Sequence, residues 1–384
     1  MLRVIWVTAS LPHGGAERHA IALMNRLAER GHQCHAVYIK NRGEKLDRIR
    51  LRDGGSVRCL DAERYLDTRA LADFATHIAR IGPSVIVAAN QYALMYSWLA
   101  LRRSGARAAL AVTFHTTLLP GAKEWLQMLY YRPFFWLADC LVFISELQRR
   151  HWLRRAVFSR RNELIYNGVD TEEFCDRWSP EEREKLRGAL GFSDADFVIG
   201  ISALLRPEKN HVQLVDAVAK LRKMGIPVRA LVIGDGVTRP AIEARALSLD
   251  LEGDVVITGF QQDVRPYVAA CDAVVQCSDA VETFSLAVLE AMALGKPVVH
   301  SDIGGAAEMI RPGENGFLFP VGDTEALVDR LARLSRRADR ERMGRKAREM
   351  VEARFSERAM VDRYERMLLD LCQTPVPTDE AVVH

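Results

Sequence analysis

The sequence predicts an α/β protein made of two Rossmann-like domains, and three observations lead to this fold class. The chain has 384 residues, of which 49% are apolar, so it is too long for a single hydrophobic core. Short apolar runs alternate with helical patterns along the whole chain, which is typical of parallel strands covered by helices on both faces. The alternation occurs twice, before and after a junction near Asn167-Gly168-Val169-Asp170.

The first half begins with a strand, a helix and a second strand. Apolar residues at positions 20, 21, 24, 27 and 28 lie on one face of a helix over 16–30, and Gly31 follows as its C-cap. The strands expected in this half are Arg3–Thr8, Gln33–Ile39, Ser84–Ala89, Ala108–Phe114 and Cys140–Ile144.

The second half repeats this scheme and ends in helices. Its expected strands are Phe197–Ala203, Val228–Ile233, Val255–Thr258, Ala273–Gln276, Pro297–Ser301 and Gly316–Phe319. Helices are expected at about 210–224, 239–249, 263–270, 285–294 and 304–310. Residues 324–371 are almost wholly helical, with a last helix at about 356–371, and the tail 373–384 is predicted to be disordered.

Composition excludes several classes of protein. No apolar run approaches the roughly 18–20 residues that span a bilayer, and the first residues lack the basic segment of a signal peptide. The seven cysteines form no Cys-x-x-Cys pair and no metal-ligand spacing, so we interpret them as buried thiols in a reducing compartment. We therefore expect a cytoplasmic protein.

The net charge of +3 hides an asymmetry between the halves of the chain. Residues 1–170 carry 25 Lys and Arg against 14 Asp and Glu, a balance of +11, and residues 171–384 have a balance of −8. This split predicts a basic domain that faces an anionic partner, although drift in surface composition would give the same numbers.

Ligand-binding residues are expected in the loops that follow the strands, because open parallel sheets bind ligands at the C-terminal ends of their strands. Gly14 and Gly15 follow the first strand and open a helix, where the backbone can approach an anion, but they also fit an ordinary βα turn. Arg206 and Lys209 precede a helix that Asn210 can cap. Two cations in this place suit a diphosphate, and a solvated surface turn is the alternative.

Motifs of three other chemistries do not fit. Gly14-Gly15 and Gly234-Asp235-Gly236 lack the third glycine of a dinucleotide fingerprint, and no Walker-type loop occurs. Hydride transfer and P-loop hydrolysis are therefore disfavoured. Asp194-Ala195-Asp196 resembles a metal-binding Asp-x-Asp, but it precedes a strand instead of following one, so a turn explains it better. We expect no catalytic metal and no cofactor.

Residues 279–297 are the segment richest in candidate residues. Glu282 lies in the loop after an expected strand, and Glu290 lies within a helical, otherwise apolar stretch. A carboxylate in such surroundings is costly unless it is paired or hydrogen-bonded. Vicinal hydroxyls of a ligand would supply those bonds, as would a buried structural ion pair. Downstream, Gly304-Gly305 opens another strand–turn–helix unit.

Together these residues resemble the retaining nucleotide-sugar glycosyltransferases of family 4 ("group 1"), which have the two-domain GT-B fold. The most specific element is Glu-x-Phe-x-x-x-x-Leu-Glu-Ala-Met-Ala-x-Gly-Lys-Pro-Val, over Glu282–Val298, followed by Gly304-Gly305. The other matching segments, spread over nearly the whole chain, are Gly14–Glu17, Phe114-His115, Ile144–Glu146, Asn167–Asp170, Arg206–Lys209 and Gly259-Phe260.

The resemblance implies two Rossmann-like domains that face each other across a cleft. Residues 1–168 would form the acceptor-binding domain, with the helix 356–371 returning to pack on it, and residues 169–355 would bind the donor. The implied activity is a hexosyltransferase that moves a sugar from an NDP-sugar to an acceptor hydroxyl, with retention and without a metal.

The resemblance also implies roles for single residues. Glu290 would hold the ribose hydroxyls and Glu282 the hydroxyls of the transferred sugar. The catalytic residues implied are His115, beside the sugar on the acceptor side, with Glu282, Arg206 and Lys209. The donor-binding residues implied, several of them through backbone amides, are Gly14, Gly15, Arg206, Lys209, Glu282, Thr283, Phe284, Ser285, Leu286, Ala287 and Glu290.

The chain departs from the family pattern near the expected diphosphate. The arginine of the usual Gly-Arg-Leu-x-Pro-Glu-Lys is replaced by Leu204, so Arg206 either substitutes from another angle or does not contribute. Lys209 is the firmer assignment. Thr283 and Ser285 replace commoner glycines, which narrows the access of the sugar to the backbone.

Two stretches of the basic half fit an anionic membrane surface. Residues 126–136 are rich in aromatic side chains, and residues 146–162 carry six arginines beside apolar residues. A core helix with a solvated basic face explains each stretch equally well. We expect a peripheral protein on the inner face of the cytoplasmic membrane that acts on a lipid-linked saccharide in exopolysaccharide or lipopolysaccharide assembly, with no nucleic-acid partner.

Two other functions fit the same architecture. A nucleotide-sugar epimerase would convert the donor without any acceptor. A non-catalytic sugar-nucleotide-binding protein would bind the donor and release no nucleotide.

Overall fold

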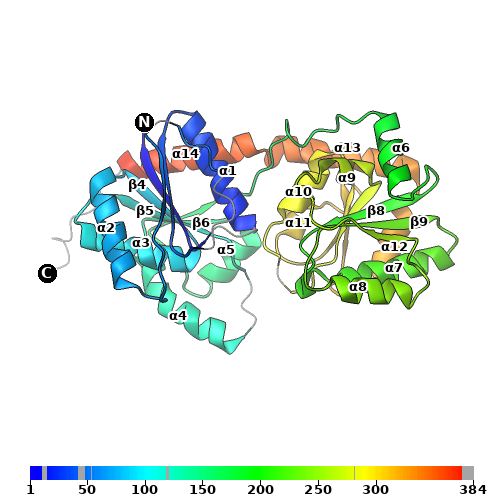
Figure 1. Cartoon of the computed structure of the whole chain (residues 1–384), viewed down its shortest axis with the longest axis horizontal. Helices are drawn as coiled ribbons and strands as arrows, with labels where there is room; N and C mark the ends of the chain where they lie inside the picture. The colour runs from blue at the N-terminus through cyan, green and yellow to red at the C-terminus, as the bar shows by residue number, and fades with distance from the viewer. Residues whose placement is uncertain (11–14, 42–47, 53, 118–120, 281, 374–384) are drawn as a thin grey trace. The chain divides into compact units, whose positions relative to one another are not determined.

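The computed structural model describes residues 1–10, 15–41, 48–52, 54–117, 121–280 and 282–373, and the chain divides into two compact units (Figure 1). Unit 1 comprises Met1–Asn167 and Ala359–His384, and unit 2 comprises Gly168–Arg358. Each unit contains a parallel sheet flanked by helices, so the predicted α/β class with two Rossmann-like domains is confirmed. The cleft between them stays a prediction.

The sheet of unit 1 has the order β3-β2-β1-β4-β5-β6-β7. The chain runs from β1 outward to β3 and then returns to β4 on the other side of β1, which places a topological switch between β1 and β4. The strands are β1 (Arg3–Thr8), β2 (Gln33–Tyr38), β3 (Ser56–Cys59), β4 (Val85–Ala89), β5 (Ala109–Phe114), β6 (Cys140–Phe143) and β7 (Arg161–Leu164).

Helices cover both faces of this sheet, because successive residues of a strand point to opposite sides. In β1, Ile5 and Val7 pack on one face with α2 (Thr68–Ile81), α3 (Asn90–Ser104) and α4 (Ala122–Trp136). On the other face, Val4 and Trp6 pack with α1 (Gly15–Glu29) and α14 (Glu357–Gln373). The last helix therefore returns to the first unit, as the resemblance implies. The remaining helix of unit 1 is α5 (Glu146–Leu153).

Unit 2 has the sheet order β10-β9-β8-β11-β12-β13. The strands are β8 (Phe197–Ser202), β9 (Val228–Ile233), β10 (Val255–Ile257), β11 (Ala273–Gln276), β12 (Val298–Ser301) and β13 (Gly316–Phe319). The helices are α6 (Pro180–Ala189), the 3₁₀ turn η2 (Pro207–Lys209), α7 (His211–Lys223), α8 (Arg239–Leu247), α9 (Arg265–Ala270), α10 (Leu286–Ala293), α11 (Ala306–Met309), α12 (Thr324–Leu334) and α13 (Arg337–Arg354).

Two expectations need adjustment. The prediction of buried thiols is wrong for Cys59 and Cys175, which are half-buried, and for Cys372, which is exposed; all seven cysteines are free. Of the expected tail, Gln373 ends α14, and residues 374–384 lie outside the described residues. In the part of the chain that is described, no helix has the length and apolarity that a membrane span requires.

Candidate active site

A short ion pair at the C-terminal edge of the unit 2 sheet joins Lys209 and Glu282. Lys209 lies in η2 after β8, and Glu282 lies in the loop between β11 and α10. Since β8 and β11 are neighbours in the sheet, these two loops meet. Lys209 Nζ lies 2.6 Å from Glu282 Oε2, and the side chains are only 21% and 11% exposed. Sequence analysis selected these two residues from distant segments, and the fold brings them together.

Two further residues, which sequence analysis missed, bind the same carboxylate. Gln276 ends β11, and its Nε2 donates to Glu282 Oε2 at 3.2 Å. The Ser278 hydroxyl lies 3.3 Å from the same oxygen. Gln276 Nε2 also donates to Ser278 Oγ at 2.9 Å, so the two side chains support each other. A single polar residue at the end of an apolar strand belongs to no motif, so the sequence gives no signal for it.

The Gly304-Gly305 turn supports the loop that carries Glu282. Gly305 N donates to Thr283 O at 2.8 Å. Gly304 has φ +58°, and a Cβ added there would lie 1.8 Å from Glu282 O. Glycine is required at this position because the backbone approaches the Glu282 carbonyl too closely for any side chain.

Helix α10 presents its first turn next to this loop. Ser285 caps the helix by accepting a hydrogen bond from Val288 N, so α10 starts at Leu286. The amides of Leu286 and Ala287 occupy the first turn, where a helix has no internal acceptors for them. Leu286 and Ala287 are half-buried residues. The position suits the anion-binding role that the resemblance gives them.

The other predicted residues of this segment are buried. Thr283 and Ser285 are almost fully covered, and the Phe284 ring packs edge-on against Phe355 at 5.4 Å between centroids. Glu290 lies on α10 among apolar neighbours and is 4% exposed. The structure therefore places Glu290 as expected, and its role toward a ribose stays a prediction.

Arg206 is not part of the Lys209–Glu282 contact. Its side chain is 57% exposed, and among the described residues its ion-pair partner is Glu208, at 4.0 Å. Asn210 occupies the N-cap position of α7 with φ +47°, but its side chain does not cap the helix and donates to Gln213 Oε1 at 3.3 Å. In the turn expected to bind a diphosphate, Lys209 is therefore held in an ion pair with Glu282, and Arg206 is solvated.

In the Asp-x-Asp segment, Asp196 has a structural role. Its Oδ2 accepts hydrogen bonds from Ser193 N at 2.7 Å and from Ser193 Oγ at 2.9 Å, and Oδ1 pairs with Arg229 Nε at 3.3 Å. Both contacts hold the turn before β8, in agreement with the turn interpretation.

In unit 1, His115 follows β5 at the C-terminal edge of the sheet. Its backbone N donates to Asn90 Oδ1 at 2.9 Å, and its ring lies edge-on to His19, with 5.1 Å between centroids. His19 Nε2 lies 3.3 Å from Tyr364 Oη of α14. Burial lowers the pKa of His115 to about 4, so its imidazole is neutral at physiological pH. Gly14 lies outside the described residues, and Gly15 is the first residue of α1.

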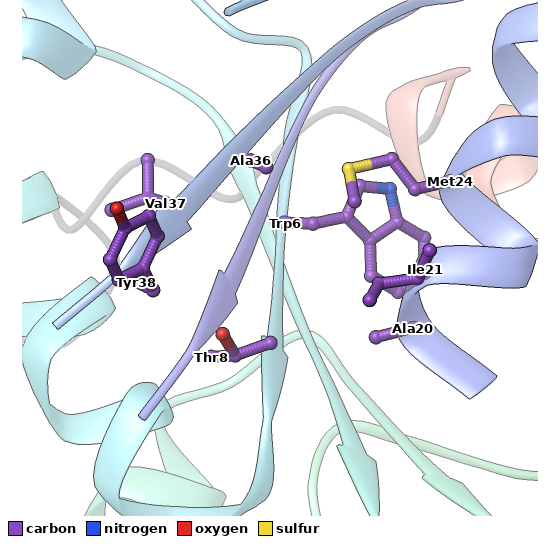
Figure 2. Close-up of a pocket in the computed structure, with 8 residues that line it drawn as sticks. All are labelled: Trp6, Thr8, Ala20, Ile21, Met24, Ala36, Val37 and Tyr38. Atoms are coloured by element: carbon purple, nitrogen blue, oxygen red, sulfur yellow. The ribbon is translucent and has the colours of Figure 1, made fainter. Parts of the chain in front are cut away.

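A small cavity lies beside β1, β2 and α1, lined by apolar residues and Thr8 (Figure 2). Its volume is about 10 Å³, enough for at most one water molecule. Trp6 Nε1 and Thr8 Oγ1 are buried without a hydrogen-bond partner among the described residues, which suits an ordered water. The cavity is too small for a nucleotide or a sugar.

The stretch with six arginines is not one basic helix, which corrects that part of the membrane prediction. Helix α5 ends at Leu153. Of the four apolar residues expected as anchors in this stretch, Trp152 and Val157 are fully buried, whereas Leu153 and Phe158 are exposed. Most of the arginines pair with carboxylates: Arg149 and Arg150 with Glu146, Arg160 with Asp139, and Arg161 with Glu163.

The aromatic-rich stretch, in contrast, is exposed. On α4, Leu126, Leu129 and Tyr130 share one helix face and are 70%, 49% and 51% exposed. Trp136 at the end of α4 lies 6.0 Å from the Phe158 ring, and both are partly exposed. We call these five residues the α4 apolar patch.

Comparison with known proteins identifies the family of this chain. The family model for glycosyl transferases group 1 matches residues 182–350, and the model for glycosyltransferase family 4 matches residues 13–173. The chain therefore belongs to the family-4, group 1 glycosyltransferases, and the resemblance seen in the sequence is confirmed.

Individual relatives differ in how much of the chain they share. The putative glycosyltransferase EpsD of Bacillus subtilis is 33% identical over 257 residues, and the match spans 65% of each chain. The lipopolysaccharide core biosynthesis glycosyltransferase LpsE of Rhizobium meliloti is 28% identical over 365 residues, which is 92% of this chain and 96% of LpsE.

A solved structure shares the fold over nearly the whole chain. Anabaena HepE, crystallised with UDP, superposes with a TM-score of 0.84 at 23% identity, covering 96% of this chain and 100% of HepE. This similarity shows the GT-B fold.

Proposed function

We propose that this protein transfers a sugar from a nucleoside diphosphate sugar to an acceptor hydroxyl, with retention at the anomeric carbon. The Lys209–Glu282 pair beside the start of α10 supports this most directly. A carboxylate accepts hydrogen bonds from sugar hydroxyls, and an ammonium group and helix N-terminal amides favour a diphosphate. HepE is solved in complex with UDP and with UDP-glucose, which supports the same class of donor.

In the proposed reaction the acceptor oxygen attacks the anomeric carbon as the bond from that carbon to the diphosphate oxygen breaks. The proton of the acceptor hydroxyl passes to a diphosphate oxygen, and both events occur on one face of the sugar. Lys209 and the amides of Leu286 and Ala287 would stabilise the charge that develops on the leaving group. Glu282 would bind the sugar through hydrogen bonds to its hydroxyls. Neutral His115 would lie on the acceptor side.

A donor screen tests this proposal. Thermal-shift assays with UDP, GDP, ADP and their sugars should reveal one stabilising nucleotide, and that sugar nucleotide should then release nucleotide when an acceptor is added. Turnover should survive EDTA, because the Lys209 ammonium offsets diphosphate charge without a metal. Strict dependence on an added divalent ion would contradict this part of the proposal.

Two variants separate the donor site from the acceptor side. Glu290→Ala should lower kcat/KM for the donor by at least about 100-fold, because it removes a buried group that would bind the ribose. His115→Ala should slow transfer while the Kd for the nucleotide stays near the wild-type value. A wild-type kcat/KM in Glu290→Ala would show that the donor-site assignment is wrong.

The same assays separate the alternative functions. An epimerase would convert the sugar nucleotide with no acceptor present, and a non-catalytic binding protein would bind it and release no nucleotide under any condition.

For the acceptor, we propose a lipid-linked saccharide at an anionic membrane surface, in exopolysaccharide or lipopolysaccharide assembly. LpsE, which matches nearly the whole chain, acts in lipopolysaccharide core biosynthesis. The α4 apolar patch provides exposed anchors, and Lys123, Arg154 and Arg155 are exposed cations on α4 and after α5. Apolar anchors beside basic residues fit the interface of an anionic bilayer. The protein would then be peripheral on the inner face of the cytoplasmic membrane.

Vesicle co-sedimentation tests the membrane part separately. The wild-type protein should bind vesicles of phosphatidylglycerol and phosphatidylcholine more tightly than phosphatidylcholine alone, and salt should weaken the binding. Leu126→Glu combined with Leu129→Glu should abolish it, whereas Met224→Glu, an exposed apolar site in unit 2, should not. Binding that ignores both lipid charge and salt would refute an electrostatic membrane contact.

A further inference from the structure

The hydrogen bonds around Glu282 are unevenly distributed between its two carboxylate oxygens. Among the described residues, the side chains that contact this carboxylate, those of Lys209, Gln276 and Ser278, all do so at Oε2. The other oxygen, Oε1, receives none of these bonds. A carboxylate has acceptor positions on both oxygens, so Oε1 keeps its full capacity to accept.

The donors to Oε2 are themselves fixed by the sheet. Gln276 is the last residue of β11 and pairs in register with His300 of β12. Ser278 is fully buried, and its carbonyl accepts from Ser301 Oγ, at the end of β12, at 2.6 Å. Ser278 Oγ also lies 3.5 Å from Lys209 Nζ. The contacts to Oε2 therefore come from the last residue of β11, from Ser278 two positions later, which β12 anchors, and from Lys209 in η2.

We propose that Gln276 and Ser278 are positioning residues that hold Glu282 by Oε2 and so aim Oε1 at a hydroxyl group of the donor sugar. This inference rests on the proposed function, and neither residue contacts the substrate in it. Lys209 keeps its bond to Glu282 and has further N–H groups for the diphosphate, so one cation connects the sugar-binding carboxylate to the leaving group.

The arrangement has a consequence for specificity. Because the carboxylate is held in contact with an ammonium group, Oε1 acts only as a hydrogen-bond acceptor. The sugar must therefore present a donor at this place, and a hydroxyl meets that requirement. A carboxylate that is free to rotate would form its hydrogen bonds with water and would discriminate less between sugars.

The test compares a sugar nucleotide with the same nucleotide lacking the sugar. Calorimetric Kd values are measured for UDP-glucose against UDP and for GDP-mannose against GDP, in the wild type, Gln276→Met and Ser278→Ala. Gln261→Met and Ser335→Ala are matched controls, since these side chains donate to backbone carbonyls elsewhere in unit 2. Thermal unfolding of each variant shows whether it is folded.

In the wild type, the sugar should increase the affinity for at least one nucleotide. In Gln276→Met and Ser278→Ala this sugar-dependent gain should fall roughly tenfold, as expected when a bond to a charged group is lost, while the Kd for the free nucleotide stays within about twofold. A merely structural role would weaken both ligands together.

The possible failures are distinct. A wild-type protein that binds no nucleotide would refute the proposed function itself. The positioning role would be overturned if either folded variant kept the full sugar-dependent gain of the wild type. It would also be overturned if the wild type itself bound UDP and GDP but gained no affinity from glucose or mannose.

Discussion

Lys209 and Arg206 follow the same strand, but their surroundings differ, and so should the effects of removing them. Lys209 contacts Glu282 inside the site, whereas Arg206 is mostly solvated and lies 4.0 Å from Glu208. We expect Lys209→Ala to lower kcat/KM for the donor by roughly 10²–10³-fold, the loss typical of removing one group that stabilises developing charge. Arg206→Ala should lower it by less than about tenfold.

Steady-state nucleotide release measures both effects. Lys220→Ala is the control for losing a lysine, because Lys220 pairs with Glu325 on the surface. Equal losses in Lys209→Ala and Arg206→Ala would show that Arg206 does replace the family arginine missing at Leu204.

His77 on α2 should make the stability of unit 1 depend on pH. Burial, followed by the nearby charges of Arg58, Arg80 and His35, lowers its pKa to about 4 in the folded state. The unfolded chain has a pKa of about 6.5 at this residue and so binds more protons between about pH 4 and 6.5. Stability is therefore lost as the pH falls through this window, by at most about 2 kcal/mol at about pH 5.

Urea denaturation at several pH values checks this expectation. His77→Gln should show a shallower loss of unfolding free energy than the wild type between about pH 7 and 5. Parallel curves for the two proteins would contradict the neutral, buried state of His77.

At the residue scale the sequence was informative where residue type and spacing form a motif. Glu282, Lys209 and the two glycines at 304 and 305 were identified in this way and lie together in unit 2. Gln276 and Ser278 were not, because their importance depends on which oxygen of Glu282 they contact. Such contacts depend on the three-dimensional structure and cannot be predicted from residue type and spacing.

At the element scale, the turn at Gly304 should be as important as any side chain of the site. A Cβ there would meet the Glu282 carbonyl at 1.8 Å, so Gly304→Ala must displace the backbone that carries Glu282. We expect the Kd for the sugar nucleotide to rise at least tenfold, because the loss of one hydrogen bond to a charged group has about this effect.

Gly313→Ala provides the matched control for this turn. Gly313 also has a left-handed backbone, with φ +81°, but a Cβ there meets nothing within 4 Å. Both variants carry the backbone strain of about 1 kcal/mol, and only Gly304→Ala moves the site. Calorimetry that shows equal effects would assign the loss to strain alone.

The elements that sequence analysis missed share a physical reason. Strands β3 and β7 lie at the two edges of the unit 1 sheet, and their sequences, Ser-Val-Arg-Cys and Arg-Asn-Glu-Leu, are partly solvated. They lack the continuous apolar run by which a buried parallel strand is predicted. The prediction of a basic helix over 146–162 was wrong for a different reason. Apolar residues of this segment such as Trp152 are buried in the core.

At the scale of the whole molecule, unit 1 is built from both ends of the chain. Helix α14 supplies Met360, Val361, Tyr364 and Leu368 to the core that contains Val4 and Trp6. Unit 2, residues 168–358, is continuous. The two-unit architecture itself could be predicted, because the alternation of apolar runs and helical patterns indicates parallel sheets, and this alternation occurs twice.

Separate expression of the units tests this dependence. The fragment 168–358 should fold alone, with a cooperative thermal transition. The fragment 1–167 should not, and a synthetic peptide of residues 357–373 should restore its near-UV circular dichroism. Cooperative unfolding of 1–167 without the peptide would contradict a structural requirement for α14.

The same discontinuity has a consequence during synthesis on the ribosome. The first 167 residues emerge well before α14, so the face of their sheet that α14 shares with α1 stays only partly covered while unit 2 is translated, for about 10–40 s at ordinary elongation rates. A nascent chain whose core lacks Met360, Val361, Tyr364 and Leu368 for so long is a natural client for holdase chaperones. The yield of this protein in cells should therefore respond to how fast its second half is translated.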